Sequence, residues 1–182
     1  TILSQCGTIF AMLLTNDTDR GHITSAASDN LKGLFEMLPV LRTGDVNSFE
    51  EIINYNLDII ESMDIETVVF SCAGCYDTFK VDYPLRRNYK FRVLHTVELF
   101  AELINSGQLN LTQKVPMTAT YHDPCHLGRN AERYEKWNGD AVQLMPLVSI
   151  NIPPKPKRTG SKGVYDAPRN ILNNIPGLKL LE

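Results

Sequence analysis

The sequence predicts an α/β fold of Rossmann-like βαβ units with a mainly parallel sheet. Short β-branched or apolar runs, of which residues 65–70 (IETVVF) are the clearest, alternate with stretches of helical periodicity. Successive predicted strands are separated by single predicted helices, which is the order of right-handed βαβ crossovers. The chain has 182 residues, of which 43% are hydrophobic, so it can bury a sizeable core without disulfide staples.

Elements in the first half follow from spacing and capping signals. A short apolar strand is expected at residues 2–4, and a helix over residues 28–38 should stop at Pro39. Ser48 and Glu51 have the spacing of a capping box, and the apolar residues behind them recur at helical intervals. The elements expected next are a strand at 65–70, a helix ending before Pro84, a strand at 91–94, and a helix at 96–105 with Gly107 as its C-cap.

The second half is predicted to continue this alternation. Asp166 and Pro168 are typical of a helix start, with Asp as the N-cap. Prolines and basic residues gather in one stretch that is expected to be a surface loop. This loop is expected at residues 138–163. The other expected elements are a strand at 117–121, a helix at 127–136 and a last strand at 178–181.

Charge and composition exclude several classes of protein. Lys and Arg number 18 against 21 Asp and Glu, and this balance argues against a nucleic-acid partner held by phosphate contacts. No apolar run approaches the ~20 residues that cross a bilayer, and the first residues lack the basic start of a secretory signal. We therefore expect a cytoplasmic protein with no transmembrane segment, which reaches a membrane only through a partner subunit.

The four cysteines indicate metal or redox chemistry. Disulfide frameworks are typical of short secreted chains, so thiols kept for another purpose fit better here. Cys6, Cys72 and Cys125, together with His95, each lie at or just past the carboxyl end of a predicted strand. Functional groups collect at that edge in parallel α/β sheets, so we expect these side chains to share one rim.

Cys72 and Cys75, in the string SCAGC, stand where a predicted strand meets a predicted helix. The positive end of the helix lowers the pKa of nearby thiols and favours thiolates. A thiolate is the ligand for zinc or for iron–sulfur iron, and it is also the redox nucleophile. The alternative is a pair of buried, unreactive thiols.

A second cluster, HDPCH, contains His122, Cys125 and His126. Combined with the CxxC, it could supply a tetrahedral zinc site; alternatively, the histidines bond backbone carbonyls while Cys125 packs. His95 is a further candidate ligand, with Glu98 as its hydrogen-bond partner. The alternative for His95 is that it caps the end of its strand.

The remaining motif is a basic stretch inside the expected loop, which is typical of a solvated linker or of a dock for an acidic partner. Its cations are Lys155, Lys157, Arg158 and Lys162. The strings GxGxxG, GxxxxGK[ST] and GxSxG are absent, so the usual dinucleotide, nucleotide and hydrolase functions lack their residues.

Four strings together resemble the cysteine-rich CCG domain: SCAGCYDTFKVDYP, LHTVELF, YHDPCHLGR and GVYDAPRNILNNIPG. That family includes the catalytic subunits of heterodisulfide reductases and the iron–sulfur subunits of glycolate- and lactate-type oxidases. RTGD at residues 42–45 also fits, and the resemblance covers most of the chain from Leu41 onward. It implies two related cysteine-rich halves, a first unit at 1–115 and an incomplete second unit at 116–182.

The resemblance also implies roles for the cysteines. Cys6 matches the first cysteine of a family repeat, Cys72 and Cys75 match its CxxC, and Cys125 opens the second repeat. In family members such cysteines hold a non-cubane 4Fe–4S cluster at which a disulfide substrate is cleaved. This chain departs from the pattern in two places, because residues 35–37 replace the family's Cys-Cys-Gly and an insertion separates HLGR from GVYDAPR.

We therefore expect a subunit of a heterodisulfide-reductase-like oxidoreductase, an enzyme component that passes electrons to a small thiol or disulfide substrate through an iron–sulfur centre. The implied partners are other redox subunits, either a flavoprotein or a ferredoxin-like protein. The alternative is a non-catalytic zinc module that docks a partner redox subunit, with ligands Cys72, Cys75, Cys125 and one of His95, His122 or His126. A thioredoxin-like dithiol at Cys72 and Cys75 is a third option.

Overall fold

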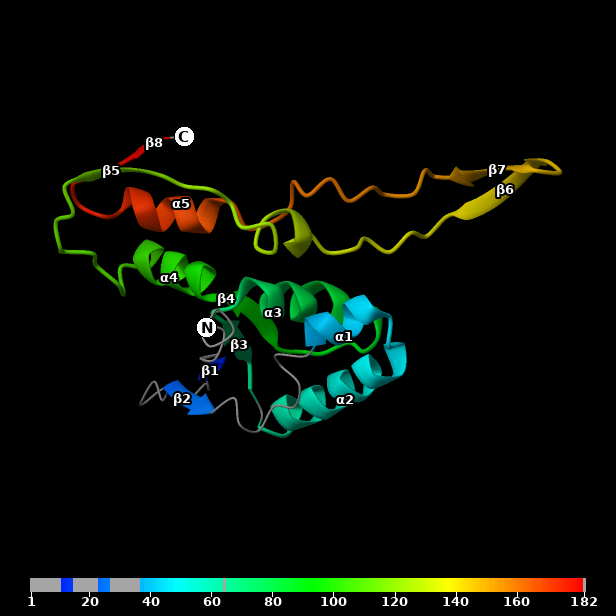
Figure 1. The fold of residues 1–182 in the computed structure, drawn as a ribbon, viewed down its shortest axis with the longest axis horizontal. Helices are drawn as coiled ribbons and strands as arrows, with labels where there is room; N and C mark the ends of the chain where they lie inside the picture. The colour runs from blue at the N-terminus through cyan, green and yellow to red at the C-terminus, as the bar shows by residue number, and fades with distance from the viewer. Residues whose placement is uncertain (1–10, 15–22, 27–36, 64, 182) are drawn as a thin grey trace.

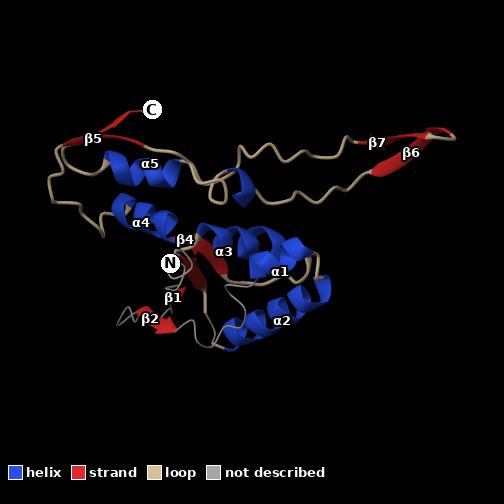
Figure 2. Ribbon diagram, in the orientation of Figure 1, coloured by secondary structure: helices blue, strands red, loops and turns tan. Residues whose placement is uncertain are grey.

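The computed structural model describes residues 11–14, 23–26, 37–63 and 65–181. Cys6, the strand expected at residues 2–4 and most of the helix expected at 28–38 lie outside the described residues. Helices and strands are mixed along the chain, which confirms the α/β class (Figure 2). None of the helices in the described part of the chain has the length and apolar character that a bilayer crossing requires.

A four-stranded sheet lies in the first part of the chain, in the order β2-β1-β3-β4. Its strands are β1 (Ala11–Leu14), β2 (Ile23–Ala26), β3 (Thr67–Phe70) and β4 (Arg92–His95). β3 and β4 run parallel with Phe70 opposite His95, so their carboxyl ends meet at one edge. β1 runs antiparallel to both of its neighbours, so the described sheet is mixed rather than mainly parallel. The Rossmann-like topology, the two related halves and the boundary at residue 115 stay predictions.

Helix α2 supplies one side of the core. α1 (Met37–Thr43) and α2 (Val46–Ser62) are joined by a turn at Gly44, whose φ of +82° favours glycine. The side chain of Asp45 caps α2 by accepting a hydrogen bond from the backbone N–H of Ser48 at 3.1 Å. The expected Ser48 cap was therefore wrong, because Asp45 reaches the free amides of the first turn before Ser48 can. The buried residues of α2 facing the core include Phe49, Ile53, Leu57 and Ile60.

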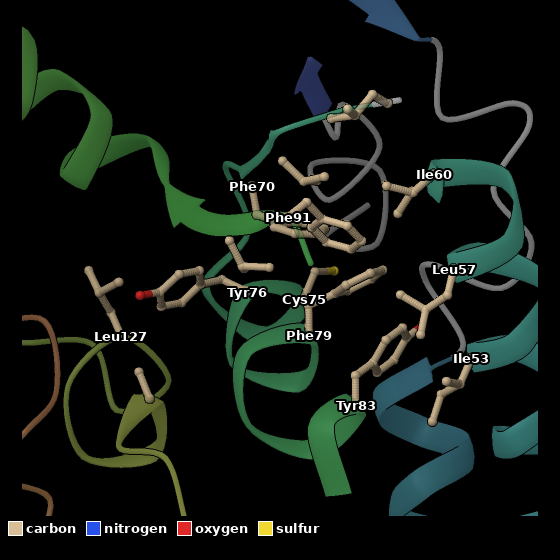
Figure 3. Close-up of a cluster of buried hydrophobic side chains, with 14 of the residues drawn as sticks. Ile53, Leu57, Ile60, Phe70, Cys75, Tyr76, Phe79, Tyr83, Phe91 and Leu127 are labelled. Atoms are coloured by element: carbon tan, nitrogen blue, oxygen red, sulfur yellow. The ribbon is translucent and has the colours of Figure 1, made fainter. Parts of the chain in front are cut away.

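The aromatic side of the core comes from one continuous helical segment, as Figure 3 shows. It consists of α3 (Ala73–Asp77), the π-helical turn η2 (Thr78–Asp82) and the 3₁₀ turn η3 (Tyr83–Leu85). Tyr76, Phe79 and Tyr83 on this segment are fully buried. Phe79 stacks on Tyr83 with ring centroids 4.0 Å apart and packs against Phe70 at 4.6 Å. Cys75 lies among these rings, so aromatic packing holds the helix that begins at the CxxC.

The later part of the chain forms a second layer, in which α5 lies beside α4 (Figure 1). Its elements are α4 (Thr96–Asn105), β5 (Met117–Thr120), η4 (Arg129–Ala131), α5 (Asp166–Asn173) and β8 (Leu178–Leu181). α4 packs against α5, and β5 pairs with β8 as a parallel two-stranded sheet. The helices and strands expected at these positions are confirmed, apart from the helix expected at 127–136. The expectation that Asp166 caps α5 was wrong, because Tyr165 is the N-cap residue and Asp166 is the first residue of the helix.

The loop expected at residues 138–163 contains a β-hairpin. β6 (Asp140–Met145) pairs antiparallel with β7 (Val148–Ile152), and the hairpin projects from the body at the end of two extended segments (Figure 1). The indole N–H of Trp137 donates a hydrogen bond to the carbonyl of Pro153 at 2.8 Å and joins the two segments at the base of the hairpin. The expectation of a plain loop was wrong because apolar and polar residues alternate along β7 (VSINI), as they do in strands, and β6 pairs with it.

Two expected helix boundaries also differ. Pro39 stops no helix, since it lies in the first turn of α1, where its missing N–H removes no helical hydrogen bond. The helix expected at 127–136 is reduced to the single turn η4. The carbonyl of Leu127 accepts a hydrogen bond from the backbone N–H of Val164, so this stretch pairs with the returning chain instead of coiling.

Candidate functional site

Cys72 and Cys75 lie directly after β3, at the carboxyl edge that β3 shares with β4. Cys72 is the half-buried N-cap residue of α3, and Cys75 is buried in the aromatic core. The Cys75 side chain hydrogen-bonds to Cys72 and, helped by backbone N–H groups of Cys75 and Gly74, lowers the pKa of Cys72 to about 5 against the opposing effect of burial. Cys72 is therefore a thiolate at neutral pH, the form that ligates metals and attacks disulfides.

His95 follows β4 at the same edge and serves as the N-cap of α4. Its Nδ1 accepts a hydrogen bond from the backbone N–H of Val97 at 3.3 Å, and its Nε2 lies 3.2 Å from the carbonyl oxygen of Ser71. The Glu98 carboxylate accepts from the backbone N–H of His95 rather than from its ring. Burial lowers the pKa of His95, so the ring is neutral at neutral pH. Both ring nitrogens thus serve the fold, and the role of His95 as a ligand stays a prediction.

The HDPCH segment divides its polar side chains between two partners. Asp123 accepts two hydrogen bonds from the Arg169 guanidinium of α5, at 2.7 and 2.8 Å, and this pairing lowers the pKa of Asp123. His126 turns the other way, and its Nδ1 lies 2.5 Å from Oδ2 of Asp77 on α3. The two remaining side chains of the segment that were singled out are exposed: His122 and Cys125.

The contact between His126 and Asp77 brings three separate strings of the sequence together. Asp77 stands two residues after Cys75 and is only 6% exposed. Burial raises the pKa of Asp77, and the hydrogen bond with His126 opposes that effect. Arg42, from the string RTGD, approaches the other ring nitrogen, with Nη2 3.4 Å from Nε2 of His126. The SCAGC, HDPCH and RTGD strings therefore meet at one imidazole ring.

A pocket of about 170 Å³ opens beside this imidazole. Its polar lining residues are Arg42, Asp77, Asp82, His126, Asn130 and Arg158. Burial raises the pKa of Asp82 to about 6. Sequence reasoning missed Asp77 and Asp82, which lie five residues apart and would stand on different faces of a regular α-helix. The π-helical turn η2 widens the spacing and lets both acids line one pocket.

The described residues do not assemble every predicted ligand at one centre. Within them, no group of three or more His, Cys, Asp or Glu side chains is arranged to hold a metal ion. Cys72 and Cys75 are the two predicted ligands that the structure brings together. The ligand roles that stay predictions are those of Cys6, which lies outside the described residues, and of His95, His122, Cys125 and His126.

Comparison with known proteins finds similarity to cysteine-rich and iron–sulfur proteins. The CCG family of cysteine-rich domains matches residues 38–80, from α1 through α2 and β3 to both thiols and Asp77. Among curated relatives, a chain of the dihydromethanophenazine:CoB–CoM heterodisulfide reductase of Methanosarcina mazei is 31% identical over 148 residues. A chain of the fumarate reductase (CoM/CoB) of Methanothermobacter marburgensis is 33% identical over 144 residues. An uncharacterized iron–sulfur protein of Methanocaldococcus jannaschii is 39% identical over 144 residues.

These matches cover 79% of this chain but only 29%, 22% and 22% of the respective relatives. The chain therefore spans less than a third of the length of these relatives. No solved structure matches it. Residues 38–80 match the cysteine-rich domain named CCG, and the chain is similar to parts of proteins named as heterodisulfide reductase and fumarate reductase subunits.

Proposed function

We propose that this chain is the cysteine-rich part of an iron–sulfur oxidoreductase subunit that exchanges electrons with a small thiol or disulfide substrate. The observation that carries the proposal is the pair Cys72 and Cys75 at the carboxyl edge of β3, where Cys72 has a pKa of about 5. Thiolates of this kind hold iron–sulfur clusters in proteins. The names of the relatives, which include one chain of a heterodisulfide reductase, support the same class of reaction.

The donor atoms present fit an iron–sulfur cluster in part. Cys72 is already ionised at neutral pH, and Cys75 is hydrogen-bonded to it, so both thiols belong to one ligand group. Cys6 and Cys125 are proposed to complete the set around a 4Fe–4S cluster of non-cubane type. When bound, such a cluster supplies one-electron transfer.

His126 and Asp77 supply the proton side of the proposed chemistry. Reduction of a disulfide to two thiols takes up two protons along with two electrons. Asp77 accepts the Nδ1 proton of His126, which orients the ring and leaves Nε2 beside Arg42 at the pocket. The Arg42 guanidinium can only donate, so Nε2 accepts from it in the structure. We assign His126 the role of carrying a proton from solvent to the departing thiolate through Nε2 when substrate takes the place of Arg42, with Asp77 as the residue that positions the ring.

The proposed electron donor is a separate redox subunit, either a flavoprotein or a ferredoxin-like protein. Two relatives are named as individual subunits of larger redox enzymes, so they act with other chains. A multi-subunit arrangement would let electrons arrive from that donor while the pocket beside His126 remains open to substrate.

Metal analysis of the chain prepared anaerobically tests this proposal. We expect iron and acid-labile sulfide in the wild-type chain and a loss of both in Cys72→Ser and Cys75→Ser. Ser71→Ala, one residue before the motif, is the matched control, because Ser71 contacts His95 through its backbone carbonyl, which alanine keeps. Colourless wild-type protein without iron would contradict the proposal, and stoichiometric zinc without sulfide would favour the zinc module instead.

A further inference from the structure

The β6–β7 hairpin is an amphipathic ribbon that stands away from the body (Figure 1). Val142 pairs across the ribbon with Ile150, and Asp140 pairs with Ile152. Because side chains alternate between the two faces of a strand, Val142, Val148, Ile150 and Ile152 lie on one face. The shift in register after Gln143 places Met145 opposite Val148 on that face too. The cross-strand pairs on the other face are Ala141 with Asn151 and Gln143 with Ser149.

The apolar face of the ribbon is exposed to solvent. Its residues keep between 39% (Val142) and 62% (Met145) of their surface, and Leu147 at the tip keeps 98%. With Leu144 and the tip included, the apolar residues expose on the order of 700 Å², more than the roughly 300–600 Å² of the largest patch on a typical monomer. A two-stranded hairpin is at best marginally stable alone in water, so this face requires a covering surface.

We propose that the apolar face of the β6–β7 ribbon is a dimerisation surface that packs against the same face of a second copy of this chain. Two such faces with their tips would bury at most on the order of 1,400 Å² in total, an upper limit that lies within the roughly 1,200–2,000 Å² of stable interfaces. Residues 141–154 contain no charged side chain, and Asp140, opposite Ile152 at the base of the ribbon, is the one charge on this face. Antiparallel packing of two copies therefore places no like charges against each other. A two-fold pairing of identical patches is the commonest form of protein oligomer.

The charges on the segment that carries the β6–β7 ribbon do not favour an acidic partner over a second copy of this chain. The segment from Gly128 to Gly163 carries seven Lys and Arg against three Asp and Glu, but these cations cluster near its base. Several already have partners there. Lys162 pairs with Glu135, Arg158 lies over the ring of Tyr134 at 4.2 Å, and Lys155 lies over Trp137 at 4.8 Å.

A lipid surface is the less suitable occupant. The open edges of a two-stranded ribbon carry backbone N–H and C=O groups without a strand partner, and these groups are costly to place in hydrocarbon.

The positive charges of the two copies stay apart in the proposed dimer. When the two ribbons pack antiparallel, the positively charged segments at their bases lie at opposite ends. At about 3.3 Å per residue, the distance from the tip to Lys155 is roughly 25 Å, well beyond the Debye length of about 8 Å at physiological salt.

Sedimentation equilibrium of the full 182-residue chain tests the proposal. We expect a reversible dimer at micromolar concentrations. Val142→Lys/Ile150→Lys should raise the dissociation constant by at least about tenfold, because it buries like charges in an apolar face. The matched control, Ala141→Lys/Asn151→Lys, changes the neighbouring cross-strand pair on the opposite face and should leave the dissociation constant unchanged.

Amide hydrogen exchange separates loss of the interface from loss of the hairpin. In the wild-type chain we expect protection of residues 142–152 to rise with protein concentration. A chain that stays monomeric at all concentrations, an equal effect of both lysine pairs, or protection that does not depend on concentration would overturn the proposal. Binding of the monomer to mixed phosphatidylcholine–phosphatidylserine vesicles would overturn it in favour of a lipid surface.

Discussion

Replacement of His126 by alanine should destabilise the fold because it removes the partner of a buried carboxylate. The side chain of Asp77 is 8% exposed, and its Oδ2 lies 2.5 Å from His126 Nδ1. Among the hydrogen bonds of the described residues, this carboxylate has one other side-chain partner. It is the hydroxyl of Thr78, which lies 3.4 Å from Oδ1. A hydrogen bond to a charged group contributes about 1.5–3 kcal/mol. Since His126 is itself 30% exposed, we expect His126→Ala to lower the free energy of unfolding by about 2 kcal/mol.

Equilibrium urea unfolding of a double-mutant cycle measures this contact. Asp77→Asn should lower the free energy of unfolding by about 1 kcal/mol, and the double variant should lose less than the sum of the single losses by at least about 1 kcal/mol. His122→Ala, in the same segment but exposed, is the control and should stay within about 0.5 kcal/mol of wild type. Losses that add to within about 0.5 kcal/mol would refute the contact between the two motifs.

Four further outcomes follow from the structure. Burial raises the pKa of Asp82 from 3.8 to about 6, so ionisation of this carboxyl destabilises the fold as pH rises through that interval. In urea titrations, Asp82→Asn should be as stable as wild type below pH 3.8. Above pH 6 it should be about 1 kcal/mol more stable, a value reduced because Asp82 is partly exposed to solvent. Phe79→Ala empties a fully buried site stacked on Tyr83 and should lower the free energy of unfolding by about 3–5 kcal/mol, and a loss below about 1 kcal/mol in the same assay would contradict the packing. Gly163→Ala would press a Cβ onto the backbone of Gly128 and should lower the midpoint of thermal unfolding by several degrees, whereas Gly44→Ala, with open space around it, should have the smaller effect of its positive φ alone. The rate at which iodoacetamide alkylates Cys72 in a Cys125→Ser background should reach half its maximum near pH 5, and a midpoint near the ordinary value of 9.0 would rule out the thiolate.

Local patterns predicted much of the architecture. The apolar periodicity behind Ser48 indicated α2, the β-branched run IETVVF indicated β3, and the helix at 96–105 was placed with its bounds. The expectation of a shared sheet edge is confirmed for Cys72 and His95, since β3 and β4 are parallel and His95 Nε2 lies 3.2 Å from the Ser71 carbonyl oxygen. It was wrong for Cys125, which follows β5 of a separate sheet, and Cys6 lies outside the described residues. These features depend on residues close in sequence, or on the general rule for parallel strands.

Long-range pairing was not accessible in this way. β5 pairs with β8 in a sheet of its own, and the contact between His126 and Asp77 joins residues 49 positions apart. The π-helical turn that brings Asp82 to the pocket has no distinctive sequence pattern. The β6–β7 hairpin did have a signal in the alternating apolar residues of β7, but the prolines and lysines around it outweighed that signal.

The most direct test of the central claim is an alkylation count by mass spectrometry, made on the chain before and after anaerobic reconstitution with iron and sulfide. We expect Cys72, which is half-buried and ionised before iron binds, to become resistant to alkylation once iron is bound, because its sulfur atom is then occupied. Iron and sulfide retained by a chain in which Cys72 is still alkylated at the rate of the untreated protein would contradict the claim.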